Sequence, residues 1–115
     1  MRGKLTLAAL LLAAPAAVLA HHGWGSFDAS KRISVEGPIQ MSEYANPHAT
    51  IKVKAPDQVW TVELAPVSRM EARGATKDMV AVGKMVKAEG NPSKSHKDIM
   101  RAERITVDGK TFEMR

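Results

Sequence analysis

The segment Ile33-Ser-Val-Glu-Gly-Pro-Ile-Gln-Met41 decides the fold of this chain. Apolar residues recur at every second position on both sides of Gly37-Pro38, and a period of two predicts a β-strand. Glycine and proline in the middle of a strand mark a bulge or an edge position. The sequence therefore predicts one long first strand that bends at Gly37.

Alternating apolar and polar residues predict the remaining strands, at residues 50–54, 59–64, 85–90 and 100–107, with a last short strand around Thr111-Phe112. Two turns between these strands have the chemistry of hairpins. Pro56-Asp57 separates the second and third strands, and Asp108-Gly109 is the strongest tight-turn signal in the chain.

One short helix is expected from Pro66 to Gly74, between the third and fourth strands. Ser68 and Glu71 have the spacing of a capping box, and Gly74 can end the helix. A long bent strand, two hairpins and a helix after the third strand predict a mainly β fold, a small five- to six-stranded OB-like Greek-key barrel. Closure would remove the exposed strand edges of so short a chain. A half-open sheet resembling a β-sandwich is the alternative architecture.

Residues 1–20 have the features of a signal peptide. Arg2 and Lys4 precede an apolar run, Leu5 to Ala17, and Val18-Leu-Ala20 provides a small-residue cleavage site. The apolar run is short for a membrane anchor, although an uncleaved anchor is the alternative. We therefore expect a periplasmic protein without stable membrane insertion, whose residues 21–115 form one domain with an N-terminal arm at 21–30.

Composition excludes several classes of function. The chain has 115 residues and no cysteine, so disulfides and thiolate metal sites are absent. Arg2 and Lys4 lie in the signal segment, which lowers the formal net charge from +5 for the whole chain to +3 for residues 21–115. So mild a charge, together with export, argues against nucleic acid as a partner.

The histidines carry the one concentrated set of metal donors. Cleavage after Ala20 would leave His21 first in the chain, where its α-amine and ring can chelate one ion. His22 follows directly, and His48 in the turn Asn46-Pro-His48 could supply a further imidazole. Amine and imidazole donors suit copper, zinc and nickel, and the order of divalent affinities favours copper. We expect His21, His22 and His48 to be metal ligands and a copper ion to be the cofactor.

Three alternatives bear on this site. Cleavage after Leu19 would place a histidine third, where amine, backbone amides and imidazole bind copper or nickel in a plane. Alternatively, the two histidines are solvated residues of a frayed terminus. Trp24 and Phe27 argue against fraying, since two aromatic rings in a short arm are expected to pack on the domain. His96, in a charged loop, is expected to be solvated, and most of the methionines are expected to fill the core.

Several of these motifs occur together in one family. They are His21-His-Gly-Trp-Gly-Ser-Phe-Asp28, Glu36-Gly-Pro-Ile39, Tyr44-Ala-Asn-Pro-His-Ala49 and Trp60-Thr-Val-Glu-Leu64. With them the chain resembles the domain of unknown function 6152 family of small exported bacterial proteins. Members often have His-His-Ser-Phe where this chain carries a small insertion. The resemblance implies a compartment and a fold but no established activity.

The function predicted from the sequence is binding or delivery of a transition metal by an exported small β-barrel. A metal-free periplasmic module that binds a ligand or a protein partner is the alternative. Catalysis is not expected, although a histidine pair of this kind can support copper oxidative chemistry.

Overall fold

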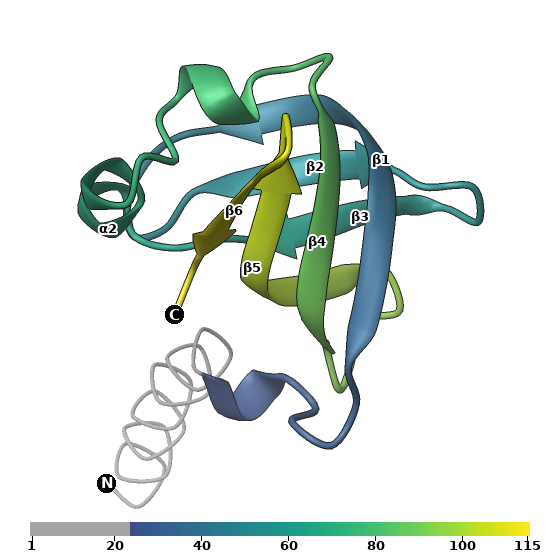
Figure 1. The fold of residues 1–115 in the computed structure, drawn as a ribbon. Helices are drawn as coiled ribbons and strands as arrows, with labels where there is room; N and C mark the ends of the chain where they lie inside the picture. Colours follow the sequence, from purple (N-terminus) through teal and green to yellow (C-terminus); the bar gives the residue numbers. More distant parts are fainter. Residues whose placement is uncertain (1–23) are drawn as a thin grey trace, which may run out of the picture.

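Strand β1 (Ile33–Glu43) pairs with two different neighbours along its 11 residues (Figure 1). In the computed structural model, which describes residues 24–115, Ile33 to Pro38 pair with β4 (Met85–Pro92). From Ile39 onward the other edge of β1 pairs with β2 (Thr50–Lys54). The strand therefore bends and changes partner at Gly37-Pro38, as the sequence predicted for the bend.

The close approach of two backbones explains the glycine at this bend. A Cβ atom on Gly37 would overlap the carbonyl group of Lys54 at the end of β2. Gly90 in β4 has the same relation to the carbonyl of Arg101, next to a bulge in the pairing of β4 with β5. Both glycines let one strand cross closely over another, which is how a small barrel turns its corners.

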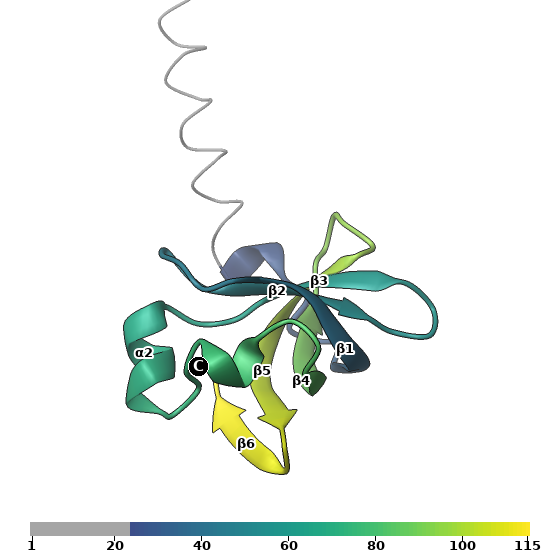
Figure 2. The ribbon, with the colours of Figure 1, turned by 90° about the horizontal axis from the view of Figure 1, so that it is seen from above.

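The barrel closes through a parallel pairing between β3 (Val59–Glu63) and β5 (Ile99–Val107). The closed sequence of neighbours is β1, β2, β3, β5 and β4, and β6 (Lys110–Glu113) continues from β5 as an extra hairpin strand (Figure 2). Asp108 and Gly109 in that hairpin turn both have positive φ, as a tight turn of this kind requires. The predicted OB-like barrel is confirmed, and the half-open sheet is excluded.

Helix α2 (Val67–Ala72) lies between β3 and β4, as predicted, but it does not begin with a capping box. Pro66 is the residue before the helix, no side chain caps the helix, and Ser68 lies inside it. Gly74, with a φ of 87°, follows the helix end. A short 3-10 helix, η2 (Asp78–Val80), completes the connection and was not predicted. None of the helices in residues 24–115 is long and apolar enough to span a bilayer.

The core follows the strand alternation. The largest fully buried side chains are Ile39, Ile51, Leu64, Met70, Met100, Ile105, Val53, Val62, Val80, Val86 and Val107. Two methionines among them fill the core, as expected. Met85 is different, because it is 58% exposed at the start of β4. Met85 is thus an exception, since core filling was expected for most of the methionines and not for each of them.

Alanine at either close-approach glycine tests this account. Gly37→Ala and Gly90→Ala should each lower the free energy of unfolding by at least about 2 kcal/mol, because the added methyl meets rigid backbone. In a domain of this size the melting temperature should fall by about 8 °C or more. Gly25→Ala is the control, since a Cβ there meets nothing within 4 Å. Equal melting temperatures for all three variants would refute the close-approach explanation.

Candidate functional site

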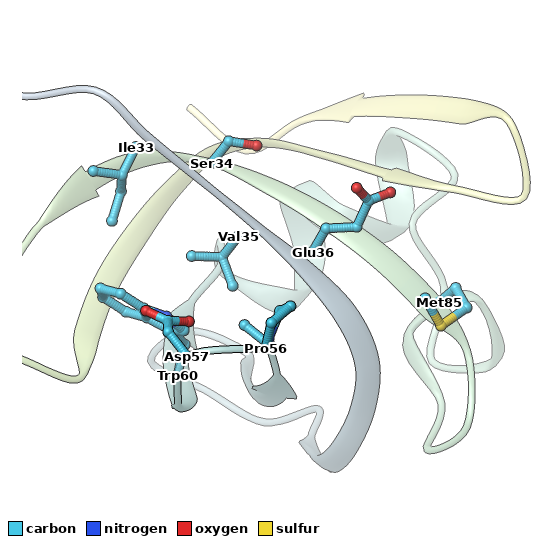
Figure 3. Close-up of a pocket in the computed structure, with 9 residues that line it drawn as sticks. Ile33, Ser34, Val35, Glu36, Pro56, Asp57, Trp60 and Met85 are labelled. Atoms are coloured by element: carbon cyan, nitrogen blue, oxygen red, sulfur yellow. The ribbon is translucent and has the colours of Figure 1, made fainter.

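A groove lies between the first half of β1 and the turn that joins β2 to β3 (Figure 3). Its volume is about 620 Å³, and buried Val35 and Ala55 lie at its base. Trp60 forms one wall and donates a hydrogen bond of 3.4 Å from Nε1 to Asp57. The exposed Met85 lies at the far side. The sequence analysis did not assign this groove, although an aromatic residue beside a Pro-Asp turn was a signal for it.

His48 lies at the open end of the β2–β3 hairpin, away from the groove. The backbone on each side of it is fixed. The peptide bond before Pro47 is cis, and the next residue, Ala49, exchanges backbone hydrogen bonds of 2.8 and 2.9 Å with Leu64 and Ala65. Tyr44, at the start of the same turn, donates from its hydroxyl to the carbonyl of Ala75 at 2.8 Å. Burial raises the pKa of this phenol. The turn is thereby attached to both the hairpin and the helical connection.

The imidazole of His48 faces a carboxylate on β3. Its Nε2 lies 3.4 Å from Oε1 of Glu63, and both side chains are mostly buried, with exposed fractions of 18% and 19%. Oε1 of Glu63 is buried and has no hydrogen-bond partner among the described residues. A buried carboxylate oxygen without a hydrogen bond is costly, so a positive charge beside it would be stabilising.

The other ring nitrogen of His48 lies between two polar groups. Nδ1 lies 3.2 Å from the carbonyl oxygen of Ala49 and 3.4 Å from the hydroxyl of Thr50. If Nδ1 carries the proton and donates it to that carbonyl, then Nε2 presents a lone pair to the Glu63 carboxylate. If Nε2 carries the proton, the ring donates to Glu63 and Nδ1 accepts from the Thr50 hydroxyl, so these distances fit both tautomers.

Arg101 completes a row of polar residues across the closure of the barrel. Strand pairing places Glu63 beside Arg101 on one side and beside Thr50 on the other. Loss of hydration lowers the pKa of the Arg101 guanidinium, and the nearby charge of Glu63 partly opposes that shift. The row therefore brings a histidine, a carboxylate and a partly desolvated guanidinium together from three elements.

Of the predicted ligands, only His48 lies in this row within the part of the chain that the structure describes. His21 and His22 lie outside the described residues, so their part of the predicted site stays a prediction. His96 lies in the exposed loop after β4, where its Nδ1 is 2.9 Å from the hydroxyl of Ser95, in agreement with a solvated residue. Within residues 24–115, no group of three histidine, aspartate or glutamate side chains could hold a metal ion.

The N-terminal arm is fixed to the barrel by the end of β4. The ring of Phe27 is only 4% exposed, which confirms the expectation that it packs on the domain. Backbone hydrogen bonds join Asp28 to Pro92 at 2.9 Å and Lys94 to Ser26 at 3.0 Å. The arm then turns at Asp28, whose carboxylate accepts two hydrogen bonds from Ser30 that lower its pKa. The short 3-10 helix η1 (Trp24–Ser26) is held just below the barrel (Figure 1).

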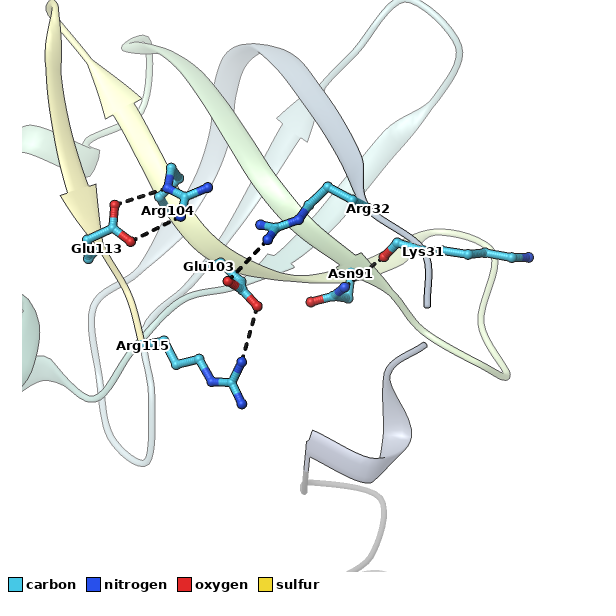
Figure 4. Close-up of polar contacts among 7 residues, drawn as sticks. All are labelled: Lys31, Arg32, Asn91, Glu103, Arg104, Glu113 and Arg115. Atoms are coloured by element: carbon cyan, nitrogen blue, oxygen red, sulfur yellow. Dashed lines mark hydrogen bonds and ion pairs between the residues drawn. The ribbon is translucent and has the colours of Figure 1, made fainter. Parts of the chain in front are cut away.

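One buried amide connects the arm to the polar row. Asn91 donates from Nδ2 to the carbonyl of Lys31 at 2.7 Å (Figure 4), and it pairs with Arg101 in the sheet. Asn91 is the one buried polar residue in the described chain. The row thus runs across the sheet from the strand that follows His48 to the strand that holds the arm.

Charges on β5 and β6 neutralise one another and offer no anion site. Glu103 accepts from Arg32 at 3.5 Å and from Arg115 at 3.3 Å (Figure 4). Arg104 donates to Glu113 at 3.0 Å, which holds the pKa of the Glu113 carboxyl below its usual range. The arginines of these pairs and Glu113 are partly solvated, whereas the Glu103 side chain is only 18% exposed.

Removal of the Phe27 ring tests how the arm is held. In Phe27→Ala, the amides of Asp28 and Lys94 should exchange with solvent at least about tenfold faster, because local opening no longer exposes a buried ring. The amides of Ile51 and Val62 should change less. Phe112→Ala removes the same ring from β6 and should not produce this local difference. Uniform acceleration at all four amides of Phe27→Ala would contradict a separately anchored arm.

Solved structures show the same fold in larger proteins. The protein is similar to the ZRD-deleted mutant of TiaS in complex with agmatine, with a TM-score of 0.55 and 13% sequence identity, over 76% of this chain and 27% of that chain. It is also similar to TiaS in a complex with an isoleucine tRNA, AMPCPP and agmatine, with a TM-score of 0.53 and 15% identity, over 70% of this chain and 19% of that one. The protein therefore spans about a quarter or less of these chains, and at such identity the likeness establishes the fold alone.

Sequence comparison gives the family. No curated protein matches the sequence. A family profile described as "Family of unknown function (DUF6152)" matches residues 8–101, which include the arm, the Asn46-Pro-His48 turn and most of the barrel. The resemblance seen in the sequence motifs is confirmed, and the protein belongs to the DUF6152 family.

Proposed function

We propose that this protein is an exported metal-binding barrel, with copper as the expected ion and His21, His22 and His48 among the ligands. Its role would be binding or delivery rather than turnover. The observation that supports this most is the contact between the His48 ring and a buried carboxylate oxygen of Glu63 that accepts no hydrogen bond from the described residues. Strand pairing connects Glu63 through Arg101 to Asn91, near the end of β4 where the arm is anchored.

The spacing of the two groups suits a shared ion. Two donors that each lie about 2.0–2.1 Å from a tetrahedral metal ion are separated by about 3.3 Å. Nε2 of His48 and Oε1 of Glu63 are 3.4 Å apart. Glu63 is thus a ligand that sequence reasoning missed, because its position beside His48 depends on the pairing of β2 with β3.

The length of the arm limits how far the amine and ring of His21 and the ring of His22 can lie from Trp24. Trp24 is only three residues after His21, so the amine of His21 lies within about 11 Å of the Trp24 backbone. Anchoring at Ser26, Phe27 and Asp28 fixes that starting point next to the barrel. A fixed arm lowers the entropy lost when the terminal histidines join a metal held by His48 and Glu63.

The donor set favours borderline ions. Amine and imidazole nitrogens with one carboxylate oxygen suit Cu(II) and Zn(II), whereas Cu(I) prefers sulfur ligands. The amine and imidazoles must lose their protons to bind, so affinity should increase as the pH rises from about 6 to about 8.

Copper titration of the processed protein tests the proposal. Protein exported by a bacterial host, with its first residue identified by mass spectrometry, should bind one Cu(II) ion. Three glycines before His21, which move the α-amine away from both histidines without placing a histidine third, or His48→Ala, should each weaken binding at least about 100-fold, because loss of a ligand costs more than the 10- to 100-fold typical of an outer-shell partner.

His96→Ala is the matched control, since it removes an exposed histidine outside the polar row. Its copper affinity should equal that of the parent. If the three-glycine extension and His48→Ala both leave the affinity unchanged, the metal site is not at these histidines and the proposal is wrong.

A second titration isolates Glu63. Glu63→Gln keeps the shape of the side chain but removes its charge, so Cu(II) affinity should fall about 10- to 100-fold. Glu36→Gln makes the same change at an exposed residue in the part of β1 that pairs with β4 and should have no effect. Equal affinities for the two variants would show that Glu63 does not take part in the metal site.

The groove between β1 and the β2–β3 turn favours a second candidate function. An apolar concavity with a tryptophan wall is typical of a ligand or partner site. The groove contains no histidine, so this function, that of a periplasmic interaction module, needs no metal.

A further inference from the structure

The edge of β1 along the groove is open for pairing. Ile39 donates to Lys84 at 2.9 Å and accepts from Gly83 at 2.9 Å, so its backbone groups point toward β4. Because backbone direction alternates along a strand, the N–H and C=O groups of Ser34 and Glu36 point to the other side. Within the described residues no strand pairs with that side before Ile39. Two residues therefore offer donors and acceptors to the groove.

Side chains divide the groove into an apolar inner face and a polar outer face. Ile33 and Val35 point toward Trp60 and Pro56, whereas Ser34 and Glu36 point to the outer side of β1 (Figure 3). A strand that lay along this edge would have its own side chains alternating between the same two faces. Its inward residues would contact apolar surface, and its outward residues would lie beside Glu36.

The negative charge of the groove favours a basic partner segment over a second copy of the same edge. Its lining contains the carboxylates of Glu36 and Asp57 and no basic side chain. Pairing with the same edge of a second copy would place two Glu36 carboxylates on one face of a short ribbon, which is unfavourable. Pro38 would also end such a pairing, since it has no N–H group. A partner segment with basic residues has the complementary charge.

We infer that this groove binds an extended peptide segment of a partner protein, with apolar and basic residues in alternation, which adds as a strand to Ser34–Glu36 of β1. Backbone hydrogen bonds to the β1 edge would give affinity, and contacts with Trp60 and Glu36 would give specificity, as in other cases of strand addition. The inference is independent of the metal site at His48.

Peptide titrations test strand addition directly. A short synthetic peptide of alternating valine and lysine should bind the full exported protein in the presence of a metal chelator, and the fluorescence of Trp60 should change in a Trp24→Phe background. A peptide with the same residues in two blocks should bind at least about tenfold more weakly, because it cannot place one residue type on each face.

Methylation of the peptide backbone separates strand addition from simple charge attraction. N-methyl groups on all valines, or on all lysines, each remove the N–H groups on one edge of the bound strand. One of the two peptides should lose at least about tenfold in affinity, since it lacks the bonds to β1, and the other should bind within about twofold of the parent. Equal affinities of these two peptides would overturn the inference.

Two variants and a small cation complete the test. Glu36→Gln and Asp57→Asn should each weaken peptide binding about two- to fivefold, the range for an exposed ion pair, while Glu43→Gln should not. If spermidine binds and the alternating peptide does not, the groove takes small cations and the inference is wrong. A peptide-free dimer that Glu36→Gln strengthens would also overturn it, because the edge would then pair with itself.

Discussion

The contact between the backbone of β1 at Gly37 and the carbonyl of Lys54 is the constraint on which this barrel depends. Only a residue without a side chain allows β2 to pass so close beneath β1. With that approach, β1 can leave β2 at Ile39 and still continue along β4 to Ile33. Without it the sheet could not curl enough for β3 to reach β5, and the parallel pairing that closes the barrel would be lost.

The same bend separates the two surfaces of functional interest. Where β1 moves away from β2, the first half of its edge is left unpaired beside Trp60, and this produces the groove. Where β3 meets β5, at the other end of the hairpin, Glu63 and Arg101 become neighbours and His48 lies over the carboxylate. One surface is apolar with an acidic rim, and the other is a polar row along the pairing of β3 with β5. Their chemistries differ because the groove lies along an unpaired strand edge, whereas the polar row lies where β3 pairs with β5.

Local patterns were enough to predict the architecture. The two-residue period, the hairpin turns and the position of the helix each depend on residues close in sequence, and the order of elements then selects an OB-like barrel. The capping box at Ser68 failed because Pro66 already supplies a fixed backbone angle at the start of α2. Glu63 and the groove were missed for a different reason. Both depend on strands that are far apart in the sequence. No local pattern predicts the register of β3 with β5 or the unpaired edge of β1.

The anchoring of the arm has a consequence for the order in which the molecule is assembled. Ser26 and Asp28 are bonded to Lys94 and Pro92, at the end of β4, so the beginning of the domain is tied to a strand that is synthesised much later. The N-terminal segment therefore has no docking surface until the end of β4 is in place. Any site that includes this segment is a product of completed folding and cannot be filled before it.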